Sequence, residues 1–177
     1  MIGKTLAAAA TLVGLTLGAN WFLLDVPTAK ILADDQRNHG IVMHAYAKWL
    51  INPRHLVLDI WSIQGENSKA DVDRVIFQAS ASLNDYSFDA VTLAFRGRGR
   101  FMLPGDYFRQ LGTEFEAGQN PIYLIRTLPE NVNHTDGSDA FPQWTGGLLG
   151  VVNKQMEDHN AFHEQWYWNE LVSDMTQ

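Results

Sequence analysis

The sequence predicts an α+β fold: a ferredoxin-like split β-α-β-β-α-β sandwich that follows an N-terminal transmembrane helix and carries extra N- and C-terminal helices. Two observations carry this prediction. Residues 5–24 form a run without a charge, and strand-like runs then alternate with helical patterns in the split order. The predicted strands are 56–63, 88–96, 100–103 and 121–127, and the predicted helices between them are 68–83 and 107–117.

Composition and charge restrict the possible functions. The 177-residue chain is 46% hydrophobic and has no cysteine, so it can build a packed core but no disulfide and no thiolate metal site. Residues 129–177 hold eight acidic side chains against Lys154 alone, and they carry the whole net charge of −7. The chain lacks the basic footprint of a nucleic-acid-binding protein and has no nucleotide motif, so we expect neither a nucleic-acid partner nor a cofactor.

The uncharged run 5–24 is long enough to cross a membrane. Its length as a helix is about 30 Å, which matches the thickness of a bilayer core. Lys4 precedes the run, Asp25 follows it, and Trp21 and Phe22 suit an interfacial position near its far end. We therefore expect a single-pass membrane protein whose partners include the lipid bilayer. Its N-terminus is cytoplasmic and its domain extracytoplasmic, which means periplasmic in a bacterium.

Two alternatives stay open for this segment. Gly18 and Ala19 could present a signal-peptidase site, although the apolar run continues through 21–24, where a mature N-terminus is usually polar. Ala10, Gly14 and Gly18 share one helical face at the spacing that lets two transmembrane helices dimerise, or they reflect only the frequency of small residues there.

Residues 27–55 are expected to form a helical connector. Pro27 should end the first helix, and Thr28 should cap the next one. Apolar residues then recur at spacings of three and four up to Asn52-Pro53, where the residue before proline is pushed out of the helical region.

Local signals set the boundaries in the rest of the chain. Ser68 is the expected N-cap of the first domain helix, with Asp71 three residues on, and Gly97 and Gly99 allow a tight reversal between strands. The expected organisation is 1–26 as transmembrane anchor or signal peptide, 27–55 as connector, and 56–177 as the α+β domain with a long loop 128–145 and a C-terminal helix 146–172.

The C-terminal helix carries two histidines within its apolar arc. The other members of that arc are Leu148, Val152, Met156, Phe162 and Trp166. His159 and His163 are four residues apart, so both imidazoles could bind one metal ion. Glu170 lies too far along the helix to join them, and a third ligand such as Asp59 or Glu66 depends on the fold. The alternative is a hydrogen-bonded histidine pair in a polar seam or at a partner interface.

Three arginines, Arg96, Arg98 and Arg100, lie around the predicted strand reversal. Arginine binds carboxylate and phosphate groups through paired hydrogen bonds, which makes this tip a candidate anion or lipid-headgroup site. Two other interpretations stay open. The tip is solvated, or it pairs with the acidic C-terminal third of the chain, within one molecule or between subunits.

Three consecutive aromatic residues, 166–168, cannot all face one core, because successive side chains of a helix are about 100° apart. We expect Trp168 to point outward, toward a partner subunit or the membrane interface. The alternative is a helix that is buried on most of its sides.

Together these patterns favour a membrane-anchored accessory or interaction protein, a non-catalytic subunit or assembly factor of a membrane or envelope complex. Its partner is another protein or a second copy of the chain. Two alternatives belong to other classes: a metal-dependent hydrolase that uses His159 and His163, and an anion- or small-ligand-binding domain that uses the arginine tip.

Overall fold

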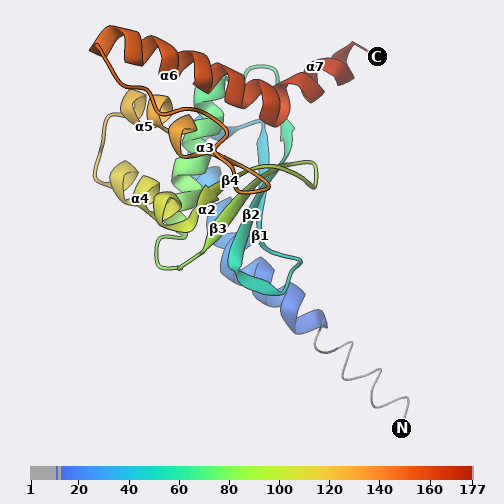
Figure 1. Ribbon diagram of the computed structural model, residues 1–177. Coiled ribbons are helices and arrows are strands. Elements are labelled where there is room, and N and C mark those ends of the chain that lie inside the picture. The colour runs from blue at the N-terminus through green and yellow to red at the C-terminus, as the bar shows by residue number, and fades with distance from the viewer. Residues whose placement is uncertain (1–10, 12, 177) are drawn as a thin grey trace.

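The structure, a computed structural model, describes residue 11 and residues 13–176, and within them a five-stranded mixed sheet forms the centre of an α+β fold (Figure 1). The strands lie in sequence order, and neighbours are antiparallel except β2 and β3, which are parallel. Their bounds are β1 Ile41–Lys48, β2 Asn52–Ile63, β3 Ala90–Phe95, β4 Arg98–Pro104 and β5 Asn133–His134.

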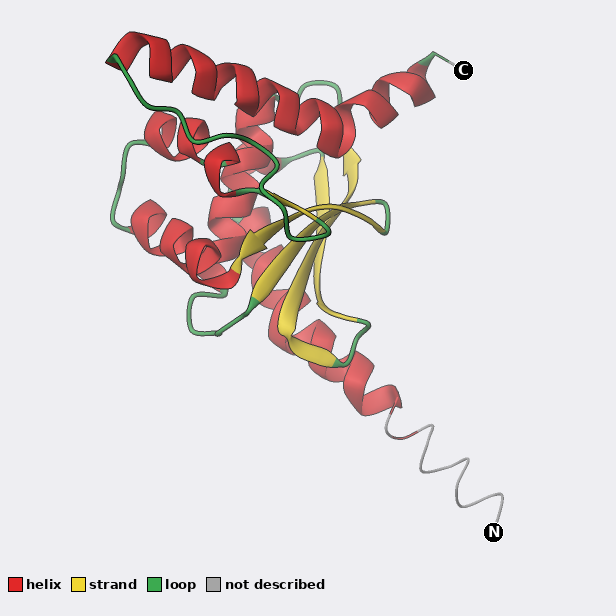
Figure 2. Ribbon diagram, in the orientation of Figure 1, coloured by secondary structure: helices red, strands yellow, loops and turns green. Residues whose placement is uncertain are grey.

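Helices are grouped on one side of this sheet (Figure 2). A helix over 13–20 leads into η1 Trp21–Asp25 and α2 Val26–Ala33. The remaining helical elements are η2 Gln36–Asn38, α3 Lys69–Ser82, α4 Gly105–Glu116, α5 Pro121–Thr127, η3 Pro129–Asn131, α6 Leu148–His163, η4 Glu164–Trp168 and α7 Asn169–Met175. Because parallel strands need a crossover connection, α3 follows β2 and returns the chain to β3.

Alternate strand residues and one stripe of α3 form the core between the sheet and the helices. In β2, Leu56, Leu58 and Ile60 are buried, and Val75 and Ile76 of α3 are buried too. Burying each such side chain contributes about 1.5–3 kcal/mol. The strands expected at 56–63, 88–96 and 100–103 correspond to β2, β3 and β4.

The segment 121–127 is a helix and not the fourth strand, so the ferredoxin-like split order is not confirmed. The side chain of Asn120 accepts a hydrogen bond from the Ile122 amide at 2.9 Å, and Pro121 occupies the first helical turn. This cap and the burial of Leu124 and Leu128, four residues apart, favour a helix over a strand.

The expected helical connector is also corrected, because 41–48 is strand β1 of the sheet. Met43, Ala45 and Ala47 are buried at the two-residue spacing of a strand. The chain then reverses into β2 through Trp49 and Leu50, which both have positive φ angles, 57° and 61°. This turn cannot be predicted from the sequence, because neither position holds a glycine, asparagine or proline.

Pro27 does not end the first helix. The helix passes through η1, a π turn, into α2, and the Val26 amide donates to the Trp21 carbonyl. A π turn carries one extra residue, which accommodates a proline that has no amide hydrogen and crowds the preceding turn. Thr28 lies inside the helix and its hydroxyl donates to the Leu24 carbonyl at 2.8 Å, so it is no N-cap.

Among the described residues, no helix combines the length and the apolar character that a membrane crossing requires. Part of the expected span 5–24 lies outside the described residues, namely 5–10 and 12, and so does Ala10 of the small-residue face.

The first helix covers the open edge of the sheet. The amides of Ala45 and Ala47 in β1 donate to the side chains of Asp25 and Asn20, at 3.0 and 2.6 Å. Asn20 also donates to the Leu50 carbonyl at 2.9 Å. These bonds occupy hydrogen-bonding groups that an edge strand otherwise leaves open.

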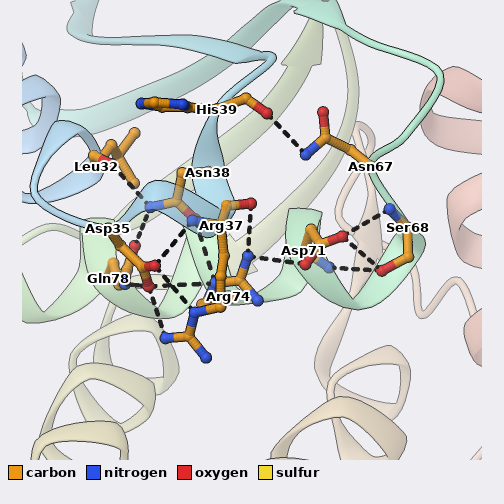
Figure 3. A network of polar contacts seen from close by, with 10 residues as sticks. All are labelled: Leu32, Asp35, Arg37, Asn38, His39, Asn67, Ser68, Asp71, Arg74 and Gln78. Atoms are coloured by element: carbon orange, nitrogen blue, oxygen red, sulfur yellow. Dashed lines mark hydrogen bonds and ion pairs between the residues drawn. The ribbon is translucent and has the colours of Figure 1, made fainter.

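A polar network fastens the turn between α2 and β1 to α3 (Figure 3). The Asp35 carboxylate accepts hydrogen bonds from Arg37 at 2.7 Å and from Gln78 at 2.9 Å, and Arg74 lies 3.5 Å from it. Gln78 in turn accepts from the Asn38 side chain at 2.6 Å. The hydrogen bond from Arg37 holds the pKa of Asp35 well below its usual range.

Candidate functional site

Helix α6 passes across α3 (Figure 1), and Asp73 of α3 meets His159 and His163 of α6. The Nε2 atoms of His159 and His163 lie 2.6 and 2.9 Å from the two carboxylate oxygens of Asp73. The two Nε2 atoms are 3.0 Å apart. The Nδ1 atom of His163 lies 3.0 Å from the Tyr167 hydroxyl. The expected histidine pair therefore does meet a carboxylate.

This cluster is buried on every side. Burial raises the pKa of the Asp73 carboxyl, but the two imidazoles beside it outweigh this effect and leave its pKa below the usual value. Burial lowers the pKa of His163, against the pull of Asp73, and burial raises the pKa of Tyr167. Because the side chains are closed off from solvent, a substrate has no direct access, which does not favour the hydrolase alternative.

The apolar arc expected for the last helix is only partly right. Leu148 is 72% exposed, while Gln155 is buried together with both histidines. The π turn η4 changes the direction of the side chains, so that Trp166 and the neighbouring Tyr167 both enter the core. The buried face of α6 and η4 is therefore more polar than the arc predicted.

Asp73 is the residue of this cluster that the sequence patterns do not predict. Glu66 is exposed, and Asp59 lies elsewhere, where it accepts hydrogen bonds from Tyr46 and Trp61 at 3.0 Å each. A signal for Asp73 does exist. It lies three and seven residues before buried positions of α3, Ile76 and Ser80, so an acidic residue occupies the buried stripe of that helix.

The arginine tip is paired with acidic residues of the C-terminal helix. Arg100 lies 2.5 Å from Glu170, Arg98 lies 3.9 Å from the same carboxylate, and Arg96 pairs with Asp174. The interpretation that pairs the tip with the acidic third of the chain is thereby confirmed within one molecule. Each of the three guanidinium groups already faces a carboxylate, which does not favour a free anion site.

Trp168 is 39% exposed, as its position in the helix predicts. Its neighbour Trp166 is buried, and the Trp166 indole donates to the Ala94 carbonyl at 3.1 Å. Trp168 therefore remains available for a contact outside the described part of the chain.

An exposed apolar surface surrounds the first helix and the turn between β1 and β2. We call it the apolar collar; its residues are Val13, Leu15, Leu17, Trp21, Phe22, Leu23, Trp49, Leu50 and Ile51. Trp49 is 79% exposed and Ile51 is 74% exposed. Leu15 and Leu23 line a groove together with Leu50 and Ile51, which shows that helix and turn form one surface.

Comparison of the chain with known protein families, with curated proteins and with solved structures finds no match.

Proposed function

We propose that this chain is a membrane-anchored accessory or interaction protein, a non-catalytic subunit or assembly factor of a membrane or envelope complex. The N-terminus is cytoplasmic, the uncharged segment that begins at residue 5 crosses the bilayer once, and the α+β domain lies on the extracytoplasmic side, in the periplasm of a bacterium. A protein partner, or a second copy of the chain, contacts the domain.

The apolar collar is the observation that carries this proposal. Soluble monomers seldom expose large contiguous apolar surfaces, and such surfaces mark contacts with proteins or membranes. The collar is formed by the first helix and the β1–β2 turn, which lie together at one end of the described domain (Figure 1). The β1–β2 turn adds Trp49 and Ile51 beside that segment, and Trp49 has a positive φ of 57° that a tryptophan seldom adopts. An apolar turn beside an anchor suits the membrane interface, where tryptophan is enriched.

Membrane extraction of the full-length chain tests the proposal. We expect the chain in the membrane fraction, resistant to high salt and alkaline carbonate and released by detergent. In spheroplasts, whose outer membrane is opened and whose inner membrane is sealed, added protease should digest the domain. Recovery of the intact chain in the soluble fraction would refute the anchor.

Copurification addresses the accessory role. A stoichiometric protein partner, or a homo-oligomer, should remain with the detergent-extracted chain. Replacement of Trp168 by a photo-crosslinking residue should capture that partner, and the same replacement at Leu148, which is also exposed, serves as a control. A monomer without any partner at either position would contradict the interaction role.

A further inference from the structure

We infer that Asp73, His159 and His163 form a closed binding site for one zinc ion that clamps α6 to α3. This inference stands apart from the proposed function, since it concerns the interior of the domain and not its anchor or its partner.

Hydrogen bonding alone cannot satisfy the three contacts of this cluster. They are Nε2 to carboxylate at 2.6 Å, Nε2 to carboxylate at 2.9 Å, and Nε2 to Nε2 at 3.0 Å. Each Nε2 atom offers either one hydrogen or one lone pair. If His159 and His163 both donate, each to its own oxygen of Asp73, the 3.0 Å contact between the two Nε2 atoms brings two N–H groups side by side with no hydrogen bond between them. If one of them does not donate, its lone pair faces a carboxylate oxygen. A cation between the two Nε2 atoms and the carboxylate removes this conflict, because it binds both lone pairs and the carboxylate at once.

The surroundings of the rings support the same conclusion. Metal-bound histidines usually direct their second nitrogen to a hydrogen-bond partner that fixes the ring. The Nδ1 atom of His163 has such a partner in the Tyr167 hydroxyl, at 3.0 Å. The buried Nδ1 atom of His159 has no such partner among the described residues, so the second-nitrogen contact supports the site at His163 alone.

The charge of the cluster also calls for a cation. Asp73 is fully buried, and among the described residues its ion-pair partners are the two histidines. The nearby Lys69 is turned to Glu164, 3.6 Å away, and to the Asn160 carbonyl. A buried carboxylate needs a compensating charge, and a divalent ion supplies it.

Ligand chemistry selects zinc. Two imidazole nitrogens and one carboxylate oxygen are ligands that Zn²⁺ prefers, at distances of about 2.0–2.2 Å. Tetrahedral ligands at such distances lie about 3.3 Å apart. The two Nε2 atoms are 3.0 Å apart and lie 2.6 and 2.9 Å from Oδ2 and Oδ1 of Asp73, so these pairs need to separate by only a few tenths of an ångström. Both carboxylate oxygens of Asp73 face the Nε2 atoms, so Asp73 can bind the ion through two oxygens and supply the fourth coordination position of a closed site.

Metal titration of the full-length chain in detergent tests this inference. After removal of metal with a chelator, we expect one equivalent of Zn²⁺ to bind by calorimetry and to raise the unfolding temperature. Co²⁺ in place of zinc should give the visible absorption bands of a four-coordinate site. No saturable binding to a folded chain, together with an unfolding temperature that neither zinc nor chelator changes, would overturn the site.

Variants locate the ion. His159→Ala/His163→Ala and Asp73→Asn should each lose the bound equivalent, whereas the exposed pair His39→Ala/His134→Ala should keep it. Since the ligand variants remove buried contacts and can unfold the chain, Tyr167→Phe provides a milder change. It should stay folded and bind zinc about tenfold more weakly. Zinc bound equally well by the folded Tyr167→Phe chain, but lost from the His39→Ala/His134→Ala chain, would place the ion elsewhere.

Discussion

At the scale of single residues, Asp35 shows how one carboxylate ties a turn to a helix. Its hydrogen bonds from Arg37 and Gln78 join η2 to α3 and keep its pKa below the value of an unfolded aspartate. Such a group contributes stability above its unfolded pKa, about 4. That contribution is lost as the pH falls from about 4 toward the lower pKa of the folded state.

The prediction is that Asp35→Asn lowers the free energy of unfolding at neutral pH by on the order of 1 kcal/mol, because a charged acceptor is replaced by a neutral one. The variant should also lose stability less steeply than the parent below pH 4. Denaturant titrations at several pH values measure both effects. Asp34→Asn, an exposed neighbour, is the control and should follow the parent. Equal acid sensitivity in parent and Asp35→Asn chains would contradict the prediction.

Residue patterns predicted two of the three residues of the candidate metal site. The i, i+4 spacing brought His159 and His163 together, because both side chains leave one face of the same helix. Asp73 could not be found this way, since it meets them only through the packing of α3 against α6, 86 residues away in sequence. The arginine tip is similar. Its positive charge could be predicted from the sequence, but its pairing with Glu170 depends on where the last helix lies.

At the scale of elements, two glycines in helices should respond in opposite ways to the same substitution. A Cβ atom at Gly112 of α4 would lie 2.7 Å from the Ser80 backbone in α3, too close for any real contact. A Cβ atom at Gly150 of α6 would meet nothing within 4 Å. Gly112 therefore allows the close approach of two helices, whereas Gly150 only adds flexibility to its helix.

We therefore expect Gly112→Ala to destabilise the fold by about 1–3 kcal/mol, because it overpacks the contact between α3 and α4. Gly150→Ala should stabilise it by about 0.5–1 kcal/mol, because alanine is the better helix former. Unfolding midpoints of the two variants, measured side by side, test both predictions. A destabilised Gly150→Ala chain, or an unchanged Gly112→Ala chain, would be inconsistent with this packing.

Elements with both a clear hydrophobic periodicity and a capping residue were predictable from the sequence. The helix that begins after Ser68 combines both, and the Ser68 side chain does accept from the Asp71 amide. The helix predicted over 41–48 was wrong because the apolar residues there fit a helical and a strand period alike, and because the turn at Trp49 contains no typical turn residue. The strand predicted over 121–127 was wrong because the β-branched and aromatic residues of the segment were given more weight than the helix start at Asn120-Pro121.

At the scale of the whole molecule, the first helix, which carries most of the apolar collar, and the junction of α6 and α7, which contains Trp168, lie toward opposite ends of the described chain (Figure 1). If the collar meets the membrane and Trp168 meets a protein, lipid should contact Trp49 of the collar but not Trp168. Brominated lipids quench tryptophan fluorescence on contact and can tell the two apart.

In vesicles of brominated lipid, we expect the tryptophan fluorescence of the parent chain to be quenched. The Trp49→Phe chain should show less quenching. Trp168→Phe should be quenched as much as the parent, and it is the matched control. An equal effect of both substitutions would place Trp168 at the membrane as well. No difference between the parent and Trp49→Phe would remove the β1–β2 turn from the interface.

The bonds from Asn20 and Asp25 to β1 have a consequence for proteolytic processing. These two side chains take the amides of Ala47 and Ala45, so the first helix shields the sheet from other chains. A protease that trims the chain after Ala19 leaves both side chains in place. Trimming beyond Asp25 leaves a bare strand that can recruit another molecule, edge to edge. The length of the trimmed N-terminus therefore decides whether the shed domain stays dispersed or aggregates.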